Sequence, residues 1–344
     1  MNKRAAFFLV FAVLVFFPLA GIAYKLLVLD YPLAGLVPAQ SYRLDVSLRV
    51  DGHGEDILVG TFLPKSDARQ TVTDEENASG RFALSILAEG DNRRASWQAE
   101  NVTGQHSLVY SYSVRARHVR YDIPAGLAIP AEYPTELREY LQAEPGIQVG
   151  DPLIAATLRE LFPEGRPDVL TAVTRVHRHL QDKLENRNFS GYTDALTALK
   201  LGEASCNGKS RLFVALARAL NLPARLVGGL VMERGVKRVS HQWVEVYING
   251  HWVPFDTIND RFAEIPSHYL TLYYGDKVLF KHTSNVNFQY FFKINKRLVP
   301  RTEALSVLND SPFNVLNLYA LFERVGISQN LLKIILMLPL GALV

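Results

Sequence analysis

Three residue types that together can carry acyl-transfer chemistry lie within one stretch of the chain, residues 202–256. They are Cys206, which is the only cysteine among 344 residues, followed by His241 and Asp256. A thiol, an imidazole and a carboxylate can serve as nucleophile, general base and orienting group. The spacing predicts a cysteine acyl-transfer site, provided that the fold brings the three side chains together.

Cys206 is expected in the first turn of a helix. Leu212, Leu216 and Leu220 recur every four residues after it, which is a helical period, and Pro223 marks the end of the helix. At a helix start, unsatisfied N–H groups and the positive end of the dipole favour a thiolate over a thiol. A solitary cysteine is also often a small buried side chain. Its neighbours in space therefore decide between the two interpretations.

A hairpin is predicted to present the base and the carboxylate. Two runs rich in β-branched and aromatic residues, 239–248 and 251–258, are separated only by Asn249 and Gly250. This dipeptide is typical of a two-residue hairpin turn. Because such a turn pairs the residues directly before and after it, the register of the whole hairpin follows.

This register places four side chains on one face of the sheet. Trp243 is expected opposite Asp256, and His241 opposite Ile258. His241 then lies diagonal to Asp256, at about 7 to 8 Å between backbones, which an imidazole and a carboxylate can bridge. Asp256 could thus hold one ring nitrogen while the other points at Cys206.

Several blocks of the sequence resemble the transglutaminase-like superfamily, relatives of the papain proteases with a rearranged chain order. The blocks are residues 205–218, 222–229, 241–247 and 252–256. The resemblance implies that Cys206, His241 and Asp256 are a catalytic triad. It also implies an α+β fold with a papain/transglutaminase-like core. A calcium requirement is known for animal relatives, but no ligand-rich loop is present, and we predict no metal and no cofactor.

A longer pattern is similar to a narrower bacterial group, in which transglutaminase domains are fused to seven transmembrane helices. Residues 54–57, 61–64 and 262–292 carry this similarity. The group is described as inactive, whereas this sequence has all three residue types of the triad. The helical bundle is missing from the sequence, which suggests a piece of a longer membrane protein.

A charge-free run, residues 5–24, follows Lys3 and Arg4. Twenty helical residues span roughly 30 Å, the thickness of the bilayer hydrocarbon core. The run predicts a transmembrane signal anchor over residues 5–29. The preceding positive charges predict a cytoplasmic N-terminus, an inner-membrane location and a periplasmic domain. A signal peptide cleaved near Ala23 is the alternative, and it also exports the domain.

Composition fits an exported globular protein. The chain is 48% hydrophobic, which is sufficient for one or two cores, and its net charge of +3 does not favour a nucleic-acid partner. One cysteine cannot form an internal disulfide, so stability must come from packing.

Residues 40–124 alternate between apolar and polar side chains and predict a small β-sandwich domain. Turns are expected at residues 51–54 and 89–92. The acidic cluster at residues 74–77 is expected to be a solvated loop rather than a metal site.

Residues 125–300 are predicted to form the transglutaminase-like domain. Asp151 and Asp168 are expected to begin helices, as is typical of capping residues. His177 and His179 point in nearly opposite directions on the second of these helices, which argues against a shared metal. Both are expected to be solvated.

The C-terminal region, residues 311–344, predicts a membrane-proximal helix followed by an apolar segment. The apolar run of residues 331–344 is too short to cross a bilayer. We therefore expect further transmembrane helices beyond it.

Three residues are predicted to line the substrate cleft: Ser205, Asn207 and Trp243, although Trp243 could equally be a core residue. The backbone N–H of Cys206 is expected to be one oxyanion donor. A second donor is expected within residues 188–192.

Two functions from different classes remain open. In the first, the Cys206 thiolate attacks a peptide or protein amide, and a thioester is resolved by water or by an amine. In the second, the domain is inactive and binds a peptide or cell-envelope ligand for a transmembrane bundle.

Overall fold

The structure, a computed structural model, describes residues 3–27, 39–187 and 192–299. Residues 40–297 form one compact unit, and helix α1 belongs to another. The predicted C-terminal segment of residues 311–344 lies outside the described residues. The same holds for all but Tyr192 of the loop predicted to supply the second oxyanion donor.

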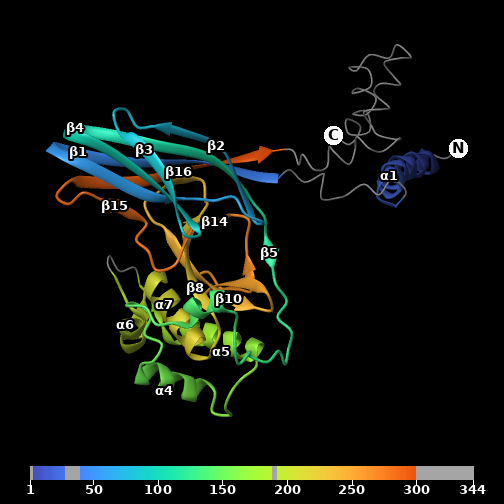
Figure 1. The fold of residues 1–344 in the computed structure, drawn as a ribbon. Helices are drawn as coiled ribbons and strands as arrows, with labels where there is room; N and C mark the ends of the chain where they lie inside the picture. Colours follow the sequence, from blue (N-terminus) through green and yellow to red (C-terminus); the bar gives the residue numbers. More distant parts are fainter. Residues whose placement is uncertain (1–2, 28–38, 188–191, 300–344) are drawn as a thin grey trace. The chain divides into compact units, whose positions relative to one another are not determined.

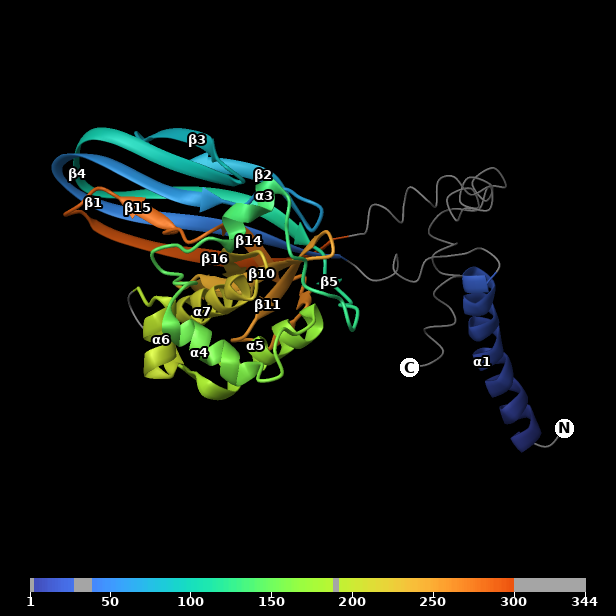
Figure 2. The ribbon, with the colours of Figure 1, turned by 60° about the horizontal axis from the view of Figure 1, so that its bottom comes forward.

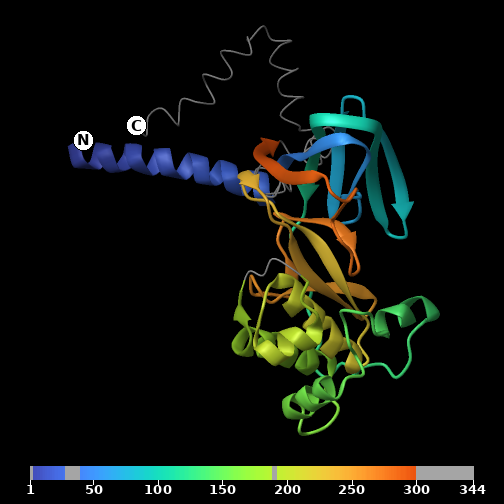
Figure 3. The same ribbon diagram turned by 90° about the vertical axis from the view of Figure 1, so that its left-hand side faces the viewer.

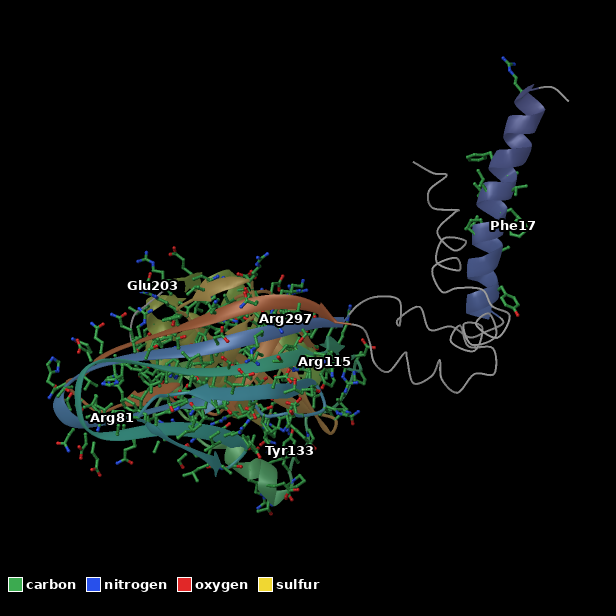
Figure 4. All side chains as sticks on the ribbon, turned by 90° about the horizontal axis from the view of Figure 1, so that it is seen from above. Phe17, Arg81, Arg115, Tyr133, Glu203 and Arg297 are labelled. Carbon is green, nitrogen blue, oxygen red and sulfur yellow. The ribbon has the colours of Figure 1, made fainter. Side chains whose placement is uncertain are left out.

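Helix α1 (Lys3–Leu27) covers nearly all of the predicted anchor and contains Pro18. Figure 4 shows Phe17 projecting from it, with 73% of its surface exposed. Among the described residues, no helix combines the length and the apolar character needed to cross a membrane. The structure therefore confirms the helix, but it does not confirm the membrane span that was predicted for it.

The N-terminal part of the larger unit is built on two long strands, β1 (Ala39–Leu63) and β4 (Asn92–Ala116), which pair antiparallel (Figure 1). Strands β2 (Gln70–Ala78) and β3 (Ala83–Glu89) both pair with β4, at opposite ends of it. Alternate side chains of β1 and β4 are buried, which confirms the predicted period of two.

The prediction of a turn at residues 51–54 is wrong, because strand β1 continues through these residues. Register shifts between His53 and Ile57 mark a bulge instead. Gly54 has a φ of 110°, which glycine tolerates, and the backbone N–H of His53 donates to the Glu55 carboxylate at 2.8 Å. The partner strand continues to supply hydrogen bonds on both sides, so the glycine-rich cluster bends the strand without ending it.

The acidic cluster at residues 74–77 also belongs to a strand, not to the predicted loop. It lies within β2, where a register shift occurs between Thr73 and Glu76. Glu75 pairs with Arg93 at 2.6 Å and accepts a hydrogen bond from the Tyr110 hydroxyl at 3.1 Å. The carboxylates of this segment therefore serve contacts across the sheet.

Strands from the C-terminal part of the unit complete this sheet. β16 (Asn287–Val299) lies between β1 and β9 (Gly235–Lys237), and β15 (Phe280–His282) pairs with β1. Within the described residues the sheet thus has seven strands, and the region predicted as a separate sandwich forms only part of it. The chain enters β1 and leaves β16 at the same end of the sheet (Figure 2), beside Arg297 and Arg115 in Figure 4.

A five-stranded antiparallel sheet forms the next layer, in the order β12-β11-β10-β8-β14. Its strands are β8 (Ala224–Val231), β10 (His241–Ile248), β11 (His251–Asp256), β12 (Arg261–Phe262) and β14 (Tyr269–Tyr274). Figure 3 shows this layer between the N-terminal sheet and the helices. Two short pairs flank it, β5 (Val119–Arg120) with β13 (Glu264–Ile265), and β6 (Glu185–Asn186) with β7 (Glu203–Ala204).

Helices cover the other face of this sheet. They are α3 (Thr135–Arg138), the short 3-10 helix η1 (Glu139–Leu141), α4 (Pro152–Leu161), α5 (Val169–Lys183), α6 (Ala195–Leu201) and α7 (Cys206–Ala219). Asp151 and Asp168 cap α4 and α5 as predicted, each accepting a backbone N–H at 2.8 Å. Helix α7 is buried along nearly its whole length and packs on β10 and β8.

Side-chain amides of the N-terminal sheet cover the outer edge of β14. The Gln70 amide donates to the carbonyl of Thr271 and accepts from its N–H, both at 2.9 Å. The Asn92 amide pairs in the same way with Tyr274, at 3.0 and 2.7 Å. These pairs satisfy an otherwise open sheet edge and fix the two sheets to each other.

Candidate functional site

Helix α7 begins at Cys206, as predicted. Ser205 is the N-cap residue, but its side chain makes no capping hydrogen bond. The backbone N–H groups of the first turn have no partner within the helix, so the thiol lies at the positive end of the helix dipole. Cys206 is half-buried and free. Its position is thus compatible with reaction at the sulfur.

A buried lysine holds the start of α7 in place. Lys209 is 1% exposed, and its Nζ donates to the carbonyls of Leu180 and Leu184 at 3.1 and 2.5 Å. These carbonyls lie at the C-terminal end of α5, where unsatisfied acceptors attract a cation. The ammonium group therefore ties the end of one helix to the first turn of the helix that carries the thiol.

The predicted hairpin register is present in the structure. Ile248 pairs with His251, and the register continues unchanged to the pair of Val244 with Phe255. Strand β11 ends one residue later, so the pairing predicted for Ile258 does not form. After β11 the chain turns and forms β12, which pairs with β11. The predicted pair of His241 with Ile258 is therefore absent from the hairpin.

His241 and Asp256 meet diagonally across the hairpin, as the register predicted. His241 Nε2 lies 2.7 Å from Asp256 Oδ2, and the carboxylate is 3% exposed. Asp256 Oδ1 accepts the backbone N–H groups of Ile258 and Asn259 at 3.0 and 3.2 Å. Both carboxylate oxygens are therefore held, and the ring is oriented from behind.

Two further side chains contact Asp256 Oδ2, and sequence reasoning missed both. Asn259 Nδ2 donates to this oxygen at 2.8 Å and lies 3.2 Å from His241 Nε2. The hydroxyl of Tyr269 donates to the same oxygen at 2.8 Å. The turn that follows Asp256 offered a local signal for Asn259. Tyr269 comes from β14, and nothing near it in the sequence marks the contact.

The titration of the pair is displaced from ordinary values. Burial lowers the pKa of His241, but the hydrogen bonds and charges of Asp256 and Cys206 outweigh it and raise this pKa to about 9. Burial raises the pKa of Asp256, but the His241 contact, with the donors Asn259 and Tyr269, lowers it to about 2. Both shifts favour the charged forms, an imidazolium beside a carboxylate.

Cys206 and His241 line one cleft of about 750 Å³. Cys206 contributes, together with Asp256, to the raised pKa of His241. Ser205 and Asn207 line the same cleft, as predicted, and the Asn207 Oδ1 lies 3.6 Å from the sulfur. The structure thus brings Cys206, His241 and two of the three predicted cleft residues together.

Trp243 is not among the residues that line this cleft. It is 1% exposed and packs with Val227, Ile265 and Tyr269. Its ring is stacked on His241 at 6.1 Å between centroids. Trp243 is therefore a core residue, which was the alternative interpretation. It contacts the site only by stacking on the His241 ring.

His177 is buried, so the prediction that it is solvated is wrong. It is 3% exposed and lies among the rings of Phe213, Phe255 and Phe262. Its Nε2 lies 3.4 Å from Asp260 Oδ1, and burial lowers its pKa. In the described part of the chain, His, Cys, Asp and Glu side chains form no group of three that could hold a metal.

Two family models match the sequence. Residues 157–257, which include Cys206, His241 and Asp256, match the model of the transglutaminase-like superfamily. Residues 24–141 match a family described as inactive transglutaminase fused to 7 transmembrane helices. The second match includes none of the three site residues.

Solved structures are similar as well. A candidate cysteine protease from Cytophaga hutchinsonii matches with 16% identity and a TM-score of 0.62, over 76% of this chain and 91% of that chain. At that identity the similarity shows the fold alone. The periplasmic domain of TgpA from Pseudomonas aeruginosa, bound to ethylmercury, matches with 13% identity and a TM-score of 0.31, over 64% of this chain and 89% of that chain. A comparison with curated proteins gave no match.

Proposed function

We propose that this chain is a membrane-anchored acyltransferase or amidohydrolase in which Cys206, His241 and Asp256 act as a catalytic triad. One observation carries the proposal. Cys206 and His241 line the same cleft, while Asp256 contacts the His241 ring at 2.7 Å. Nucleophile, proton carrier and orienting group thus have the relationship that thiol catalysis needs.

The first half of the reaction forms a thioester. The Cys206 thiolate attacks the carbonyl carbon of a peptide or protein amide, and the oxyanion that develops is stabilised by the backbone N–H of Cys206. The carbon–nitrogen bond then breaks. The His241 imidazolium gives its proton to the leaving ammonia or amine, and Asp256 keeps the ring in the orientation needed for that transfer.

The second half releases the acyl group. Water or a second amine attacks the thioester and loses a proton to the now neutral His241. The carbon–sulfur bond breaks, and the thiolate and the imidazolium are restored. Water gives hydrolysis and an amine gives transfer, so the same residues serve both outcomes.

A second function is favoured by the family name matched over residues 24–141, which describes an inactive domain. In this alternative the cleft beside Cys206 binds a peptide or envelope ligand without chemistry and signals to transmembrane helices. The presence of all three triad side chains in mutual reach supports the enzyme instead.

Thiol alkylation separates the two. At about pH 6 a free thiol is less than about one per cent thiolate, because its ordinary pKa is about 8.5. For an enzyme we expect iodoacetamide to label Cys206 many times faster than free cysteine, and His241→Ala to remove this advantage. His282→Ala, in an exposed strand away from the cleft, is the matched control. Labelling at the rate of free cysteine, unaffected by His241→Ala, would refute the enzyme.

The proposed location is the inner membrane, with the domain in the periplasm. The charge-free run within α1 and the name of the matched family support it. The chain also enters and leaves the larger unit at one end of its sheet, which suits attachment to a single membrane surface. Because Cys206 is the only thiol, it is a direct reporter: a membrane-impermeant maleimide should label it in cells with a permeabilised outer membrane. Labelling only after lysis of the inner membrane would contradict this location, with Cys206→Ser as the blank.

A further inference from the structure

A buried tyrosine that comes from outside the hairpin touches the proposed triad. Tyr269 is 1% exposed, and its hydroxyl donates to Asp256 Oδ2 at 2.8 Å, the same oxygen that lies 2.7 Å from His241 Nε2. Its ring lies edge-on to those of His241 and Trp243, at 6.0 and 5.5 Å. The hydroxyl therefore contacts the carboxylate in the interior of the protein. Tyr269 is not among the residues that line the cleft.

The position of Tyr269 is determined by the N-terminal sheet. Arg69, directly before β2, donates from Nη1 to the carbonyl of Tyr269 at 2.9 Å. Two residues further along β14, Gln70 holds both backbone groups of Thr271. The backbone N–H of Tyr269 donates to the carbonyl oxygen of Pro266 at 3.1 Å. The backbone of this residue is thus fixed on both sides, so its hydroxyl is presented to Asp256 in one position.

We propose that Tyr269 is a positioning residue of the triad, which shares the carboxylate oxygen of Asp256 with His241 and so limits how strongly this oxygen binds the imidazolium. The inference rests on the proposed function. Three donors, from His241, Asn259 and Tyr269, converge on Asp256 Oδ2. Each donor stabilises the charged carboxylate and lowers its affinity for a proton, so loss of one donor strengthens the bonds to the others.

This competition matters for the proton that His241 must release to the leaving amine. A general acid works best when its proton is not bound too tightly, and a carboxylate with fewer partners would bind the imidazolium proton more strongly. The titratable and charged groups around the pair are Cys206 from α7, Arg261 from β12 and His177 from α5. Of these groups, Arg261 also interacts with the Tyr269 side chain.

The test is an NMR titration of the His241 imidazole in the full chain with Tyr269→Phe. This variant keeps the ring and removes only the hydroxyl. We expect the pKa of His241 to rise by about 0.3 to 1 unit, the equivalent of one ordinary hydrogen bond. Tyr274→Phe, in the same strand but in contact with Arg225, is the control and should leave the titration unchanged. An unchanged or lowered pKa in Tyr269→Phe would overturn the proposal.

A second substitution keeps the hydroxyl and tests for a shift of the His241 pKa in the opposite direction. With 3-fluorotyrosine at position 269 the hydroxyl becomes a stronger donor, so the pKa of His241 should fall, and a rise would overturn the proposal. Failure of the proposed function is recognised separately, since Cys206 would then react with iodoacetamide no faster than free cysteine in the unaltered protein. The titration of His241 can be measured whatever the outcome of that experiment.

Discussion

Gly229 of β8 lies directly opposite His241 of β10, and its lack of a side chain makes room for the residues that pack behind the proposed triad. A Cβ atom at this position would lie 2.0 Å from the carbonyl oxygen of Leu270 and 2.6 Å from the Trp243 ring. The β14 backbone and the ring that supports His241 both occupy the space of the missing methyl group. The packing of the candidate site therefore depends on a glycine that contributes no side chain to it.

Gly229→Ala should destabilise the protein. The clash involves a backbone atom and a buried ring, so neither can move aside without shifting β14 or Trp243. We expect a loss of about 1 to 3 kcal/mol in the free energy of unfolding, as for overpacked cores, measured by urea denaturation. The iodoacetamide reactivity of Cys206 should fall together with it.

Gly150→Ala is the matched control for this change. No heavy atom lies within 4 Å of a Cβ built there, so the free energy of unfolding should stay within about 0.5 kcal/mol of the parent. Equal stability of the two alanine variants would show that the packing around Gly229 is looser than described.

Asp256→Asn should lower the pKa of His241. The substitution keeps a side chain of the same size but removes the negative charge that stabilises the imidazolium. Loss of a charge partner at 2.7 Å is expected to shift the imidazole by about 1 to 3 units, as followed by an NMR titration. Asp260→Asn is the control, because its partners are His177 and Gln181. If Asp256→Asn leaves the pKa of His241 unchanged, the short contact between these two side chains is absent in solution.

The pair also predicts how stability depends on pH. The folded pKa of His241, about 9, lies above its ordinary value of about 6.5, so its contribution is complete below about pH 6.5 and disappears as pH rises through about 9. The difference in unfolding free energy between the parent and His241→Gln should shrink over this window, as measured by urea denaturation. For Asp256 the sign is reversed: its contribution is complete above about pH 3.9 and is lost as pH falls through about 2. A constant difference between pH 6 and 10, roughly, would contradict the pairing of His241.

Gln70→Leu should loosen the connection between the two sheets. The variant leaves the N–H and the carbonyl of Thr271 without the side-chain amide that satisfies them. A buried polar group left unpaired costs about 1 to 3 kcal/mol, which urea denaturation resolves. Gln98→Leu, at an exposed position of β4, should change stability by less than about 0.5 kcal/mol. Equal effects of both variants would indicate that water replaces the amide.

Local patterns were sufficient to predict the parts of the site that depend on one hairpin and one helix start. The turn at Asn249 and Gly250 determines the register by itself, so the diagonal contact of His241 with Asp256 followed from counting residues. The position of Cys206 in the first turn of α7 followed from the spacing of leucines. Both are consequences of short-range geometry that any surrounding fold would retain.

Predictions failed where a residue's role depends on partners that are distant in the sequence. The cluster at residues 51–54 reads as a turn in isolation, yet the long strand β4 offers hydrogen bonds on both sides of it, so β1 continues. His177 was predicted to be solvated from its position on one helix alone. In the structure, aromatic rings from β11 and β12 enclose it.

The amino-acid sequence by itself determined which chemical groups this protein has for reaction, and which local elements carry them. Only the tertiary structure decided that Cys206 opens into the same cleft as His241, and that Tyr269 and Asn259 complete the environment of Asp256. The physical reason is that hydrogen bonds between neighbouring turns and strands follow the backbone repeat. Contacts between layers arise from the packing of whole sheets, which no local period records.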